Sequence, residues 1–205
     1  MTPRLVVLAL VLLPAAANAQ AAAPPAAPAK SATPPAAEQI AAAVLPLPQE
    51  FRADARVLGY RAGSHALVPL RGGKGPFTCL ASDPSGQGFH VACYHESLEP
   101  FMARGRALRA SGVKGDQVDT VRFAEVRAKK LAMPTHPASL YQLFGPPDAF
   151  DAATGTAKKA QSLFIVYLPG ATAESTGLST KPAEGTPWLM FPGTPKAHIM
   201  LEPKM

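Results

Sequence analysis

Apolar and aromatic residues gather in short segments that turn residues separate. The first segments span 55–61, 65–70, 77–83 and 89–95. Gly, Ser and Pro fill the connections between them, as in Pro84-Ser85-Gly86-Gln87-Gly88. Segments of this length and composition predict β-strands, and their short connections predict an antiparallel meander.

The two cysteines test the register of one predicted hairpin. If the turn is centred on Gly86, Cys79 lies directly opposite Cys93, and Phe77 lies opposite His95. Directly opposed residues of an antiparallel pair have α-carbons about 4.5–5.5 Å apart, within the range of a disulfide. The pattern therefore predicts a Cys79–Cys93 disulfide.

A helical period replaces the strand period after residue 96. One face of the predicted helix collects Leu98, Phe101, Met102, Gly105 and Leu108. Ser97 is expected to cap this helix and Gly112 to end it, with Glu99 in the first turn and Arg104, Arg106 and Arg109 on other faces. Residues 116–128 suit a second helix or a strand, and the pattern leaves both open.

The last third of the chain returns to strand-like segments at 139–144, 163–168, 188–191 and 197–201. We therefore predict an α+β fold: an antiparallel, β-rich single domain with one or two helices, covering residues 49–205.

The first 48 residues predict a signal for export, followed by a linker. Arg4, the apolar run Leu5–Leu13 and the small residues around Ala17–Ala19 predict a signal peptide over 1–19, cleaved before Gln20. The apolar run is too short to span a bilayer, which needs about 20 residues. Residues 20–48 are rich in Ala and Pro and predict a linker with a possible short helix at 38–47. The mature chain is expected in the periplasm or outside the cell.

The charge and the cysteine content limit the classes of partner that this protein could bind. The chain has 20 Lys and Arg, 14 Asp and Glu, and a formal net charge of +6. The basic residues are scattered, and no nucleic-acid-binding motif occurs. Two cysteines at short spacing fit one disulfide in an oxidising compartment. An envelope polymer, a small molecule or another protein remain as partners.

Some of the His, Cys and Met residues are spaced closely enough to suggest a metal site. His90, Cys93 and His95 are close in sequence, but strand alternation places His90 on the opposite face and the disulfide removes the thiolate. His198 and Met200 share a strand face, which would suit a soft metal. We favour a structural disulfide and core packing, and predict no metal and no cofactor.

The sequence was also compared with the known motifs of catalytic sites. Ser175 lies in a polar segment with Glu174, but no Gly-x-Ser-x-Gly, His-Glu-x-x-His, phosphate loop or dinucleotide fingerprint occurs. Residues 172–177 are therefore expected to form a capped turn.

Five short sequence blocks resemble those of other proteins. These are 90–95, 97–105, 172–177, 187–195 and 197–200, with the sequences HVACYH, SLEPFMARG, TAESTG, PWLMFPGTP and AHIM. Together they resemble an uncharacterised group of exported bacterial proteins. The resemblance implies a self-standing exported domain and brings no activity, cofactor or structure.

Two functional hypotheses remain. The first is a non-catalytic exported domain that binds a ligand or partner, with an exposed aromatic patch near Trp188 and Phe191. The second is an unrecognised hydrolase or transferase using His95, Glu99 and either Ser175 or His198. The candidate functional residues are His95, Glu99, Arg104, Glu174, Ser175, Trp188 and His198.

Overall fold

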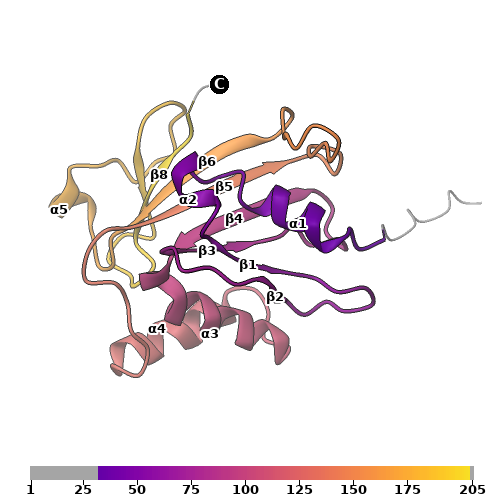
Figure 1. Cartoon of the computed structure of the whole chain (residues 1–205). Coiled ribbons are helices and arrows are strands. Elements are labelled where there is room, and N and C mark those ends of the chain that lie inside the picture. Colours follow the sequence, from indigo (N-terminus) through magenta and orange to yellow (C-terminus); the bar gives the residue numbers. More distant parts are fainter. Residues whose placement is uncertain (1–31, 204–205) are drawn as a thin grey trace, which may run out of the picture.

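The computed structural model describes residues 32–203, and they contain one eight-stranded sheet with helices on both faces (Figure 1). The strands are β1 Arg56–Gly59, β2 Val68–Arg71, β3 Phe77–Leu80, β4 Phe89–His95, β5 Ala138–Gly145, β6 Gln161–Tyr167, β7 Trp188–Met190 and β8 His198–Leu201. Their order across the sheet is β2-β1-β3-β4-β5-β6-β8-β7. The predicted signal peptide and residues 20–31 of the predicted linker lie outside the described residues.

The predicted β3–β4 hairpin is confirmed in its register. Phe77 pairs with His95 and Cys79 with Cys93. The two cysteines form a disulfide with their α-carbons 4.0 Å apart. Both are fully buried, so the bond lies inside the core and joins the two strands there.

The predicted meander is wrong at the start of the sheet. β2 turns back along the outer side of β1, and β1 then pairs with β3 in parallel, with Val57 beside Cys79. The loop from β2 to β3 must therefore cross the end of β1. It passes so close that a Cβ on Gly73 would lie 2.1 Å from the carbonyl oxygen of Asp54, and only glycine fits there.

Within the described residues, five α-helices and one 3-10 turn accompany the sheet, more than the one or two helices expected. They are α1 Ala36–Ala43, α2 Gln49–Arg52, η1 Glu96–Leu98, α3 Glu99–Ala110, α4 Gln117–Arg127 and α5 Ala173–Thr176. The helical alternative for residues 116–128 is thereby confirmed. No helix within residues 32–203 is long and apolar enough to cross a membrane.

The helix after β4 begins differently from the expectation. The cap at this point is His95, whose Nδ1 accepts a hydrogen bond from the Ser97 backbone at 3.2 Å, and η1 precedes α3. The predicted buried face holds, because Phe101, Gly105 and Leu108 are buried in α3.

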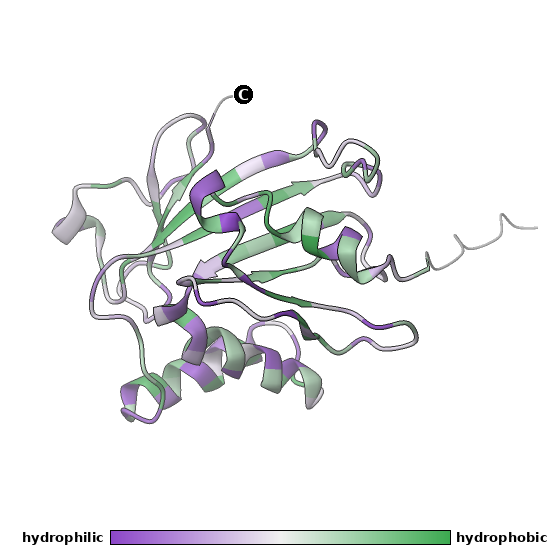
Figure 2. Cartoon of the chain, viewed as in Figure 1, coloured by the Kyte–Doolittle hydropathy of each residue, from purple (hydrophilic) through white to green (hydrophobic). Residues whose placement is uncertain are grey.

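Strand alternation divides the core into two layers. α1 and α2 cover the face that carries Val57, Phe77 and Cys93. α3 and α4 pack against one end of the opposite face, which carries Tyr94 and Leu140. Figure 2 shows hydrophobic residues along the central strands and a mixture of both kinds on α3 and α4, as expected of helices with one covered face.

The folded unit extends to the N-terminal side of residue 49. Ala43, Val44 and Leu47 are buried against β1 and β3. Gln39 of α1 is 4% exposed, and its side chain bonds the backbone of Tyr60 at 2.8 and 2.9 Å. The short helix expected within 38–47 is present as α1, but this part of the predicted linker is not a spacer, because its buried residues pack in the core.

Candidate functional site

The sheet face opposite α1 is covered at only one end. Leu98 of η1 and Met102 of α3 pack with Tyr94 and Leu140, whereas Leu80, Ala92 and Phe144 lie farther along the same face of β3, β4 and β5. Phe144 is 37% exposed, one of the few large apolar side chains that are. An apolar strip of sheet is therefore left open to solvent.

This strip forms the floor of a hollow that we call the hairpin groove, beside the β3–β4 turn. It encloses ≈ 580 Å³, and its apolar lining comes from Tyr60, Leu67, Leu80, Ala92 and Phe144. A second hollow shares Tyr60, Leu67 and Asp83 with the first and continues the groove toward α3. His65, Arg106 and Arg109 line this second part.

Arg106 is held in place at the wall of the groove by a hydrogen-bond network of one buried and one partly exposed side chain. Its guanidinium donates to the Tyr94 hydroxyl and to the Glu99 carboxylate, both at 2.7 Å. The Tyr94 hydroxyl in turn donates to Glu99 at 2.5 Å. Burial raises the pKa of Tyr94 well above its ordinary value, and the hydrogen bond to Glu99 raises it further. The phenol therefore stays protonated and fixes both charged partners.

Other polar side chains that line the groove include Tyr60, Asp83 and His90. Burial, and then the nearby Asp83 carboxylate, raise the pKa of Tyr60 to about 12, so its hydroxyl remains a donor. The Asp83 carboxylate accepts from the Ser85 backbone at 2.8 Å and from its hydroxyl at 2.7 Å, which occupies one oxygen. His90 pairs with Gln142 through Nε2 and Oε1 at 2.9 Å on the floor.

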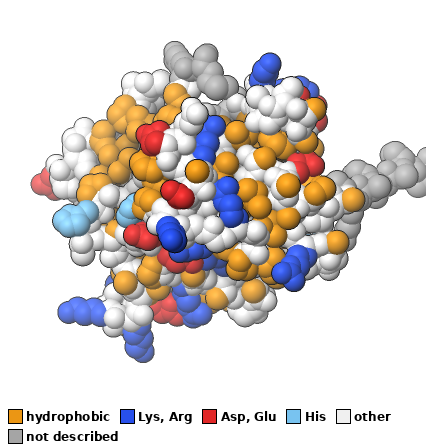
Figure 3. All heavy atoms as spheres, viewed as in Figure 1, with side chains coloured by type: hydrophobic (Ala, Val, Ile, Leu, Met, Phe, Trp, Pro, Cys, Tyr) orange, Lys and Arg blue, Asp and Glu red, His pale blue; other side chains and the backbone are white. Residues whose placement is uncertain are grey.

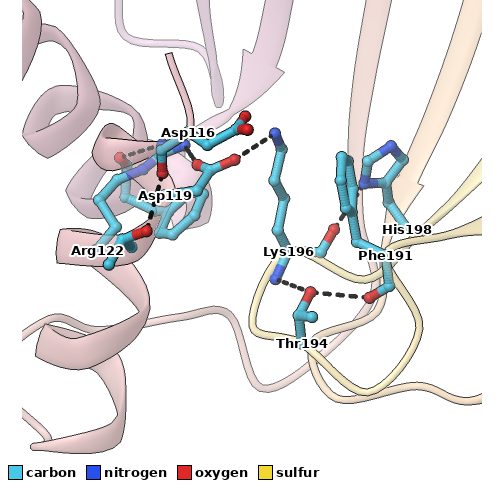
Figure 4. Close-up of polar contacts among 9 residues, drawn as sticks. Asp116, Asp119, Arg122, Phe191, Thr194, Lys196 and His198 are labelled. Atoms are coloured by element: carbon cyan, nitrogen blue, oxygen red, sulfur yellow. Dashed lines mark hydrogen bonds and ion pairs between the residues drawn. The ribbon is translucent and has the colours of Figure 1, made fainter. Parts of the chain in front are cut away.

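A separate polar cluster joins α4 to the loop before β8 (Figure 4). The Asp119 carboxylate accepts from Arg122 and, at 2.8 Å, from Lys196. Burial raises the pKa of Asp119, but the hydrogen bonds and charges of Lys196 and Arg122 outweigh it and hold the pKa below the usual range. Arg122 is 4% exposed, and its guanidinium lies 3.8 Å from the centre of the Phe101 ring.

His198 belongs to the same cluster. Its Nδ1 donates to the Lys196 carbonyl at 2.6 Å, and its ring lies between those of Tyr167 and Phe191. Burial lowers the pKa of His198, so the ring is neutral at pH 7 and Nε2 is an acceptor. Phe191 has a left-handed φ of 53°, which is rare for a bulky residue, and this conformation places its ring beside both His198 and Lys196.

The candidate residues from the sequence are distributed over several places. Glu99 does not line the groove but holds the wall residue Arg106, and His198 is part of the α4 cluster. His95 contacts Ser97 and the Phe77 ring. Arg104 pairs with Glu125 and so links α3 to α4. No contact among the described residues joins His95 to Glu99 or His198.

The remaining candidates lie near β7. Trp188 is only 8% exposed and packs in the second core cluster, so no exposed aromatic patch is built on it. Ser175 and Glu174 lie in α5, where Thr172 and Ser175 make a reciprocal capping box, as the predicted capped turn requires. Within the described part of the chain, no three His, Cys, Asp or Glu side chains gather in a way that could hold a metal ion.

Sequence reasoning missed the floor and wall of the groove. The available signal was alternation: the positions of β3 and β4 facing away from the disulfide carry Leu80, His90 and Ala92. The wall residue Arg106 was assigned to solvent, because its partner Tyr94 lies on the preceding strand and not on the helix.

Comparison with protein-family models, with curated proteins and with solved structures finds no match for this chain.

Proposed function

We propose that this chain is a non-catalytic, exported ligand-binding domain whose hairpin groove binds a small amphipathic acid. The observation that carries the proposal is an exposed apolar floor beside the Arg106 guanidinium, which the buried Tyr94 and the partly exposed Glu99 hold in place. Export is supported by the signal-like N-terminus and by the disulfide, which suits an oxidising compartment.

The floor suits an apolar body. Leu80 and Ala92 are partly exposed, and Phe144 is 37% exposed, at the centre of a hollow of ≈ 580 Å³. Removal of apolar surface from water is favourable by about 25 cal/mol per Å², so a chain or ring laid on this strip gains from each contact. A hollow of this size accepts a small molecule and not a folded partner.

The wall suits an acidic group. Arg109 is exposed and takes part in no ion pair among the described residues. Arg106 lies one turn earlier on α3, and its network with Tyr94 and Glu99 limits its movement. A carboxylate or phosphate at this end would accept from Arg109 and from the Tyr60 hydroxyl.

The hydrolase or transferase hypothesis has less support. His95, Glu99 and Ser175 each make local contacts on different elements, and neither part of the groove is lined by His95 or His198. A nucleophile needs a base within hydrogen-bond reach, and these residues are engaged with other partners.

Decanoate is the probe for this proposal, with 1-decanol as its neutral counterpart, and calorimetry measures both affinities. Phe144→Ser should weaken decanoate binding about fivefold or more, because it removes the aromatic floor. Arg109→Gln should weaken decanoate about two- to fivefold and leave 1-decanol unchanged, as expected for one exposed ion pair.

Phe191→Ser is the matched control, because Phe191 has the same side chain and the same exposed fraction of 37%. It should leave the decanoate affinity unchanged. Equal losses in the Phe144 and Phe191 variants, or a loss only in the Phe191 variant, would contradict binding in the groove. Absence of decanoate binding to the wild type would contradict the proposed ligand class.

A further inference from the structure

The C-terminal end of α4 carries a concentration of unpaired positive charge. Arg127, Lys129 and Lys130 are all exposed, and none belongs to an ion pair among the described residues. Lys130 also interacts electrostatically with the Glu125 carboxylate, but that carboxylate accepts its hydrogen bonds from Arg104, at 2.8 Å from Nε and 2.6 Å from a terminal nitrogen. Figure 3 shows Lys and Arg side chains projecting at the lower left, where Figure 1 places the end of α4.

An apolar hollow lies beside Arg127, two and three residues before Lys129 and Lys130 in the chain. It encloses ≈ 360 Å³, and Arg127 stands in its lining. The other lining residues are almost all apolar or glycine: Phe123, Val126, Met133, Pro169, Gly170, Gly193, Thr194 and Pro195. We call this hollow and the three cations the α4-end surface.

The α4-end surface is rigidly supported. The Asp119–Lys196 contact of 2.8 Å ties α4 to the loop that supplies Pro195. Arg104 and Glu125 tie α4 to α3. The helix dipole favours cations in the last turn of any helix. The dipole therefore explains the positive charge at the end of α4, but it does not explain the apolar hollow beside that charge.

The backbone at this end is also unusual. Lys129 has a left-handed φ of 56°, at the position after a helix where glycine is favoured. Its backbone N–H bonds the Val126 carbonyl at 2.9 Å, which closes the helix. A lysine thus occupies a site whose backbone disfavours it, and the helix end alone does not account for its side chain.

We propose that the α4-end surface docks this domain onto an anionic lipid membrane. Cations within a few residues of one another attract anionic headgroups, and the apolar hollow that Arg127 lines accepts the adjoining part of an acyl chain. An acidic protein would satisfy the cations but has no need of a narrow apolar hollow. This inference is independent of the hairpin groove, which lies at the opposite end of the strands from the turn after β6.

Sedimentation with lipid vesicles tests the docking. We expect the full chain to bind phosphatidylglycerol vesicles and to show little binding to phosphatidylcholine vesicles at 150 mM salt. Replacing Arg127, Lys129 and Lys130 together with Gln should weaken binding about a hundredfold, because each cation near an anionic surface contributes about fivefold to the affinity. Val126→Ser should weaken it about threefold by removing apolar lining.

The matched control replaces Lys74, Lys158 and Lys181 with Gln, which changes the net charge equally at exposed lysines elsewhere. It should lose little vesicle binding. Equal losses in the two triple variants, or an unchanged affinity in Val126→Ser with an unchanged melting temperature, would overturn the proposal. So would equal binding to both kinds of vesicle, or displacement from phosphatidylglycerol by polyglutamate at low concentration, which would indicate an acidic protein partner instead.

Discussion

Replacement of Asp119 by Asn tests the polar cluster that joins α4 to β8. The wild-type carboxylate accepts from Arg122, whose side chain is 5% exposed, and from Lys196, whose side chain is 23% exposed. The substitution keeps the shape of the side chain and removes its charge. Arg122 would then be a nearly buried cation without an opposite charge, and its contacts would be the Phe101 carbonyl, at 3.1 Å, the Phe101 ring and the neutral amide oxygen of the new side chain.

The expected magnitude follows from this burial. Leaving one member of a fully buried ion pair without its partner costs about 3–5 kcal/mol. Asp119 itself is 22% exposed, so solvent screens part of the charge, and we expect Asp119→Asn to cost about 2–3 kcal/mol. Lys196→Met removes the more exposed partner and should cost about 1 kcal/mol or less. Asp148→Asn, in a pair at the surface, should have no measurable effect.

The dependence on pH gives an independent check. The folded-state pKa of Asp119 lies below its usual 3.8, so the carboxylate stabilises the fold above that pH and loses this contribution as the pH falls through the folded-state pKa. The stability difference between wild type and Asp119→Asn should therefore be full at pH 7 and shrink below about pH 4. Urea unfolding followed by circular dichroism measures it. Equal losses in the Asp119 and Asp148 variants, or a difference that does not change with pH, would refute the reasoning.

Three further predictions concern the core and the end of α4, each read from unfolding in urea. Replacing Cys79 and Cys93 together with Ala should cost about 3 kcal/mol, because the disulfide closes a loop with a sequence separation of 14; an unchanged stability would mean that the bond does not form. Phe101→Ala should cost about 3–5 kcal/mol, since the side chain is fully buried, and a loss below about 1 kcal/mol would contradict that burial. Lys129→Gly should stabilise the fold by about 0.5–1 kcal/mol by relieving its left-handed φ, while Lys130→Gly should not, and the reverse order would contradict the assigned backbone.

Local patterns predicted the parts of the fold that depend on neighbouring segments. The β3–β4 register follows from one turn and two cysteines, and the buried face of α3 follows from its helical period. The order of β1 and β2 does not follow from such patterns. It depends on the close approach of Gly73 to the Asp54 backbone, a contact that no periodicity records.

The N-terminal boundary was missed for a different reason. Alanine suits a tether, a helix surface and a tightly packed core alike, so Ala42 and Ala43 carry no signal of burial in the sequence. Gln39 is polar and nevertheless buried, because the backbone of Tyr60 satisfies its amide. The burial of the two alanines and of Gln39 depends on packing against β1. Because α2 separates α1 from β1 in the chain, this packing is not visible in the local sequence.

The candidate sites depend on contacts between distant segments. Lys196 and Asp119 are 77 residues apart in the sequence, and neither belongs to a motif. Strand alternation could have predicted which residues form the floor of the hairpin groove, but not that they are exposed to solvent. That exposure depends on how far α3 and α4 extend across the sheet.

Binding in the hairpin groove is the central claim, and amide chemical shifts in a titration with decanoate test it most directly. The account predicts that the largest shift changes map to Leu80, Ala92 and Phe144 on the floor and to Arg109 at the wall. It also predicts that the amides of β7 and α5 stay unchanged. Changes confined to residues outside the groove, or no saturable change at any amide, would contradict the account.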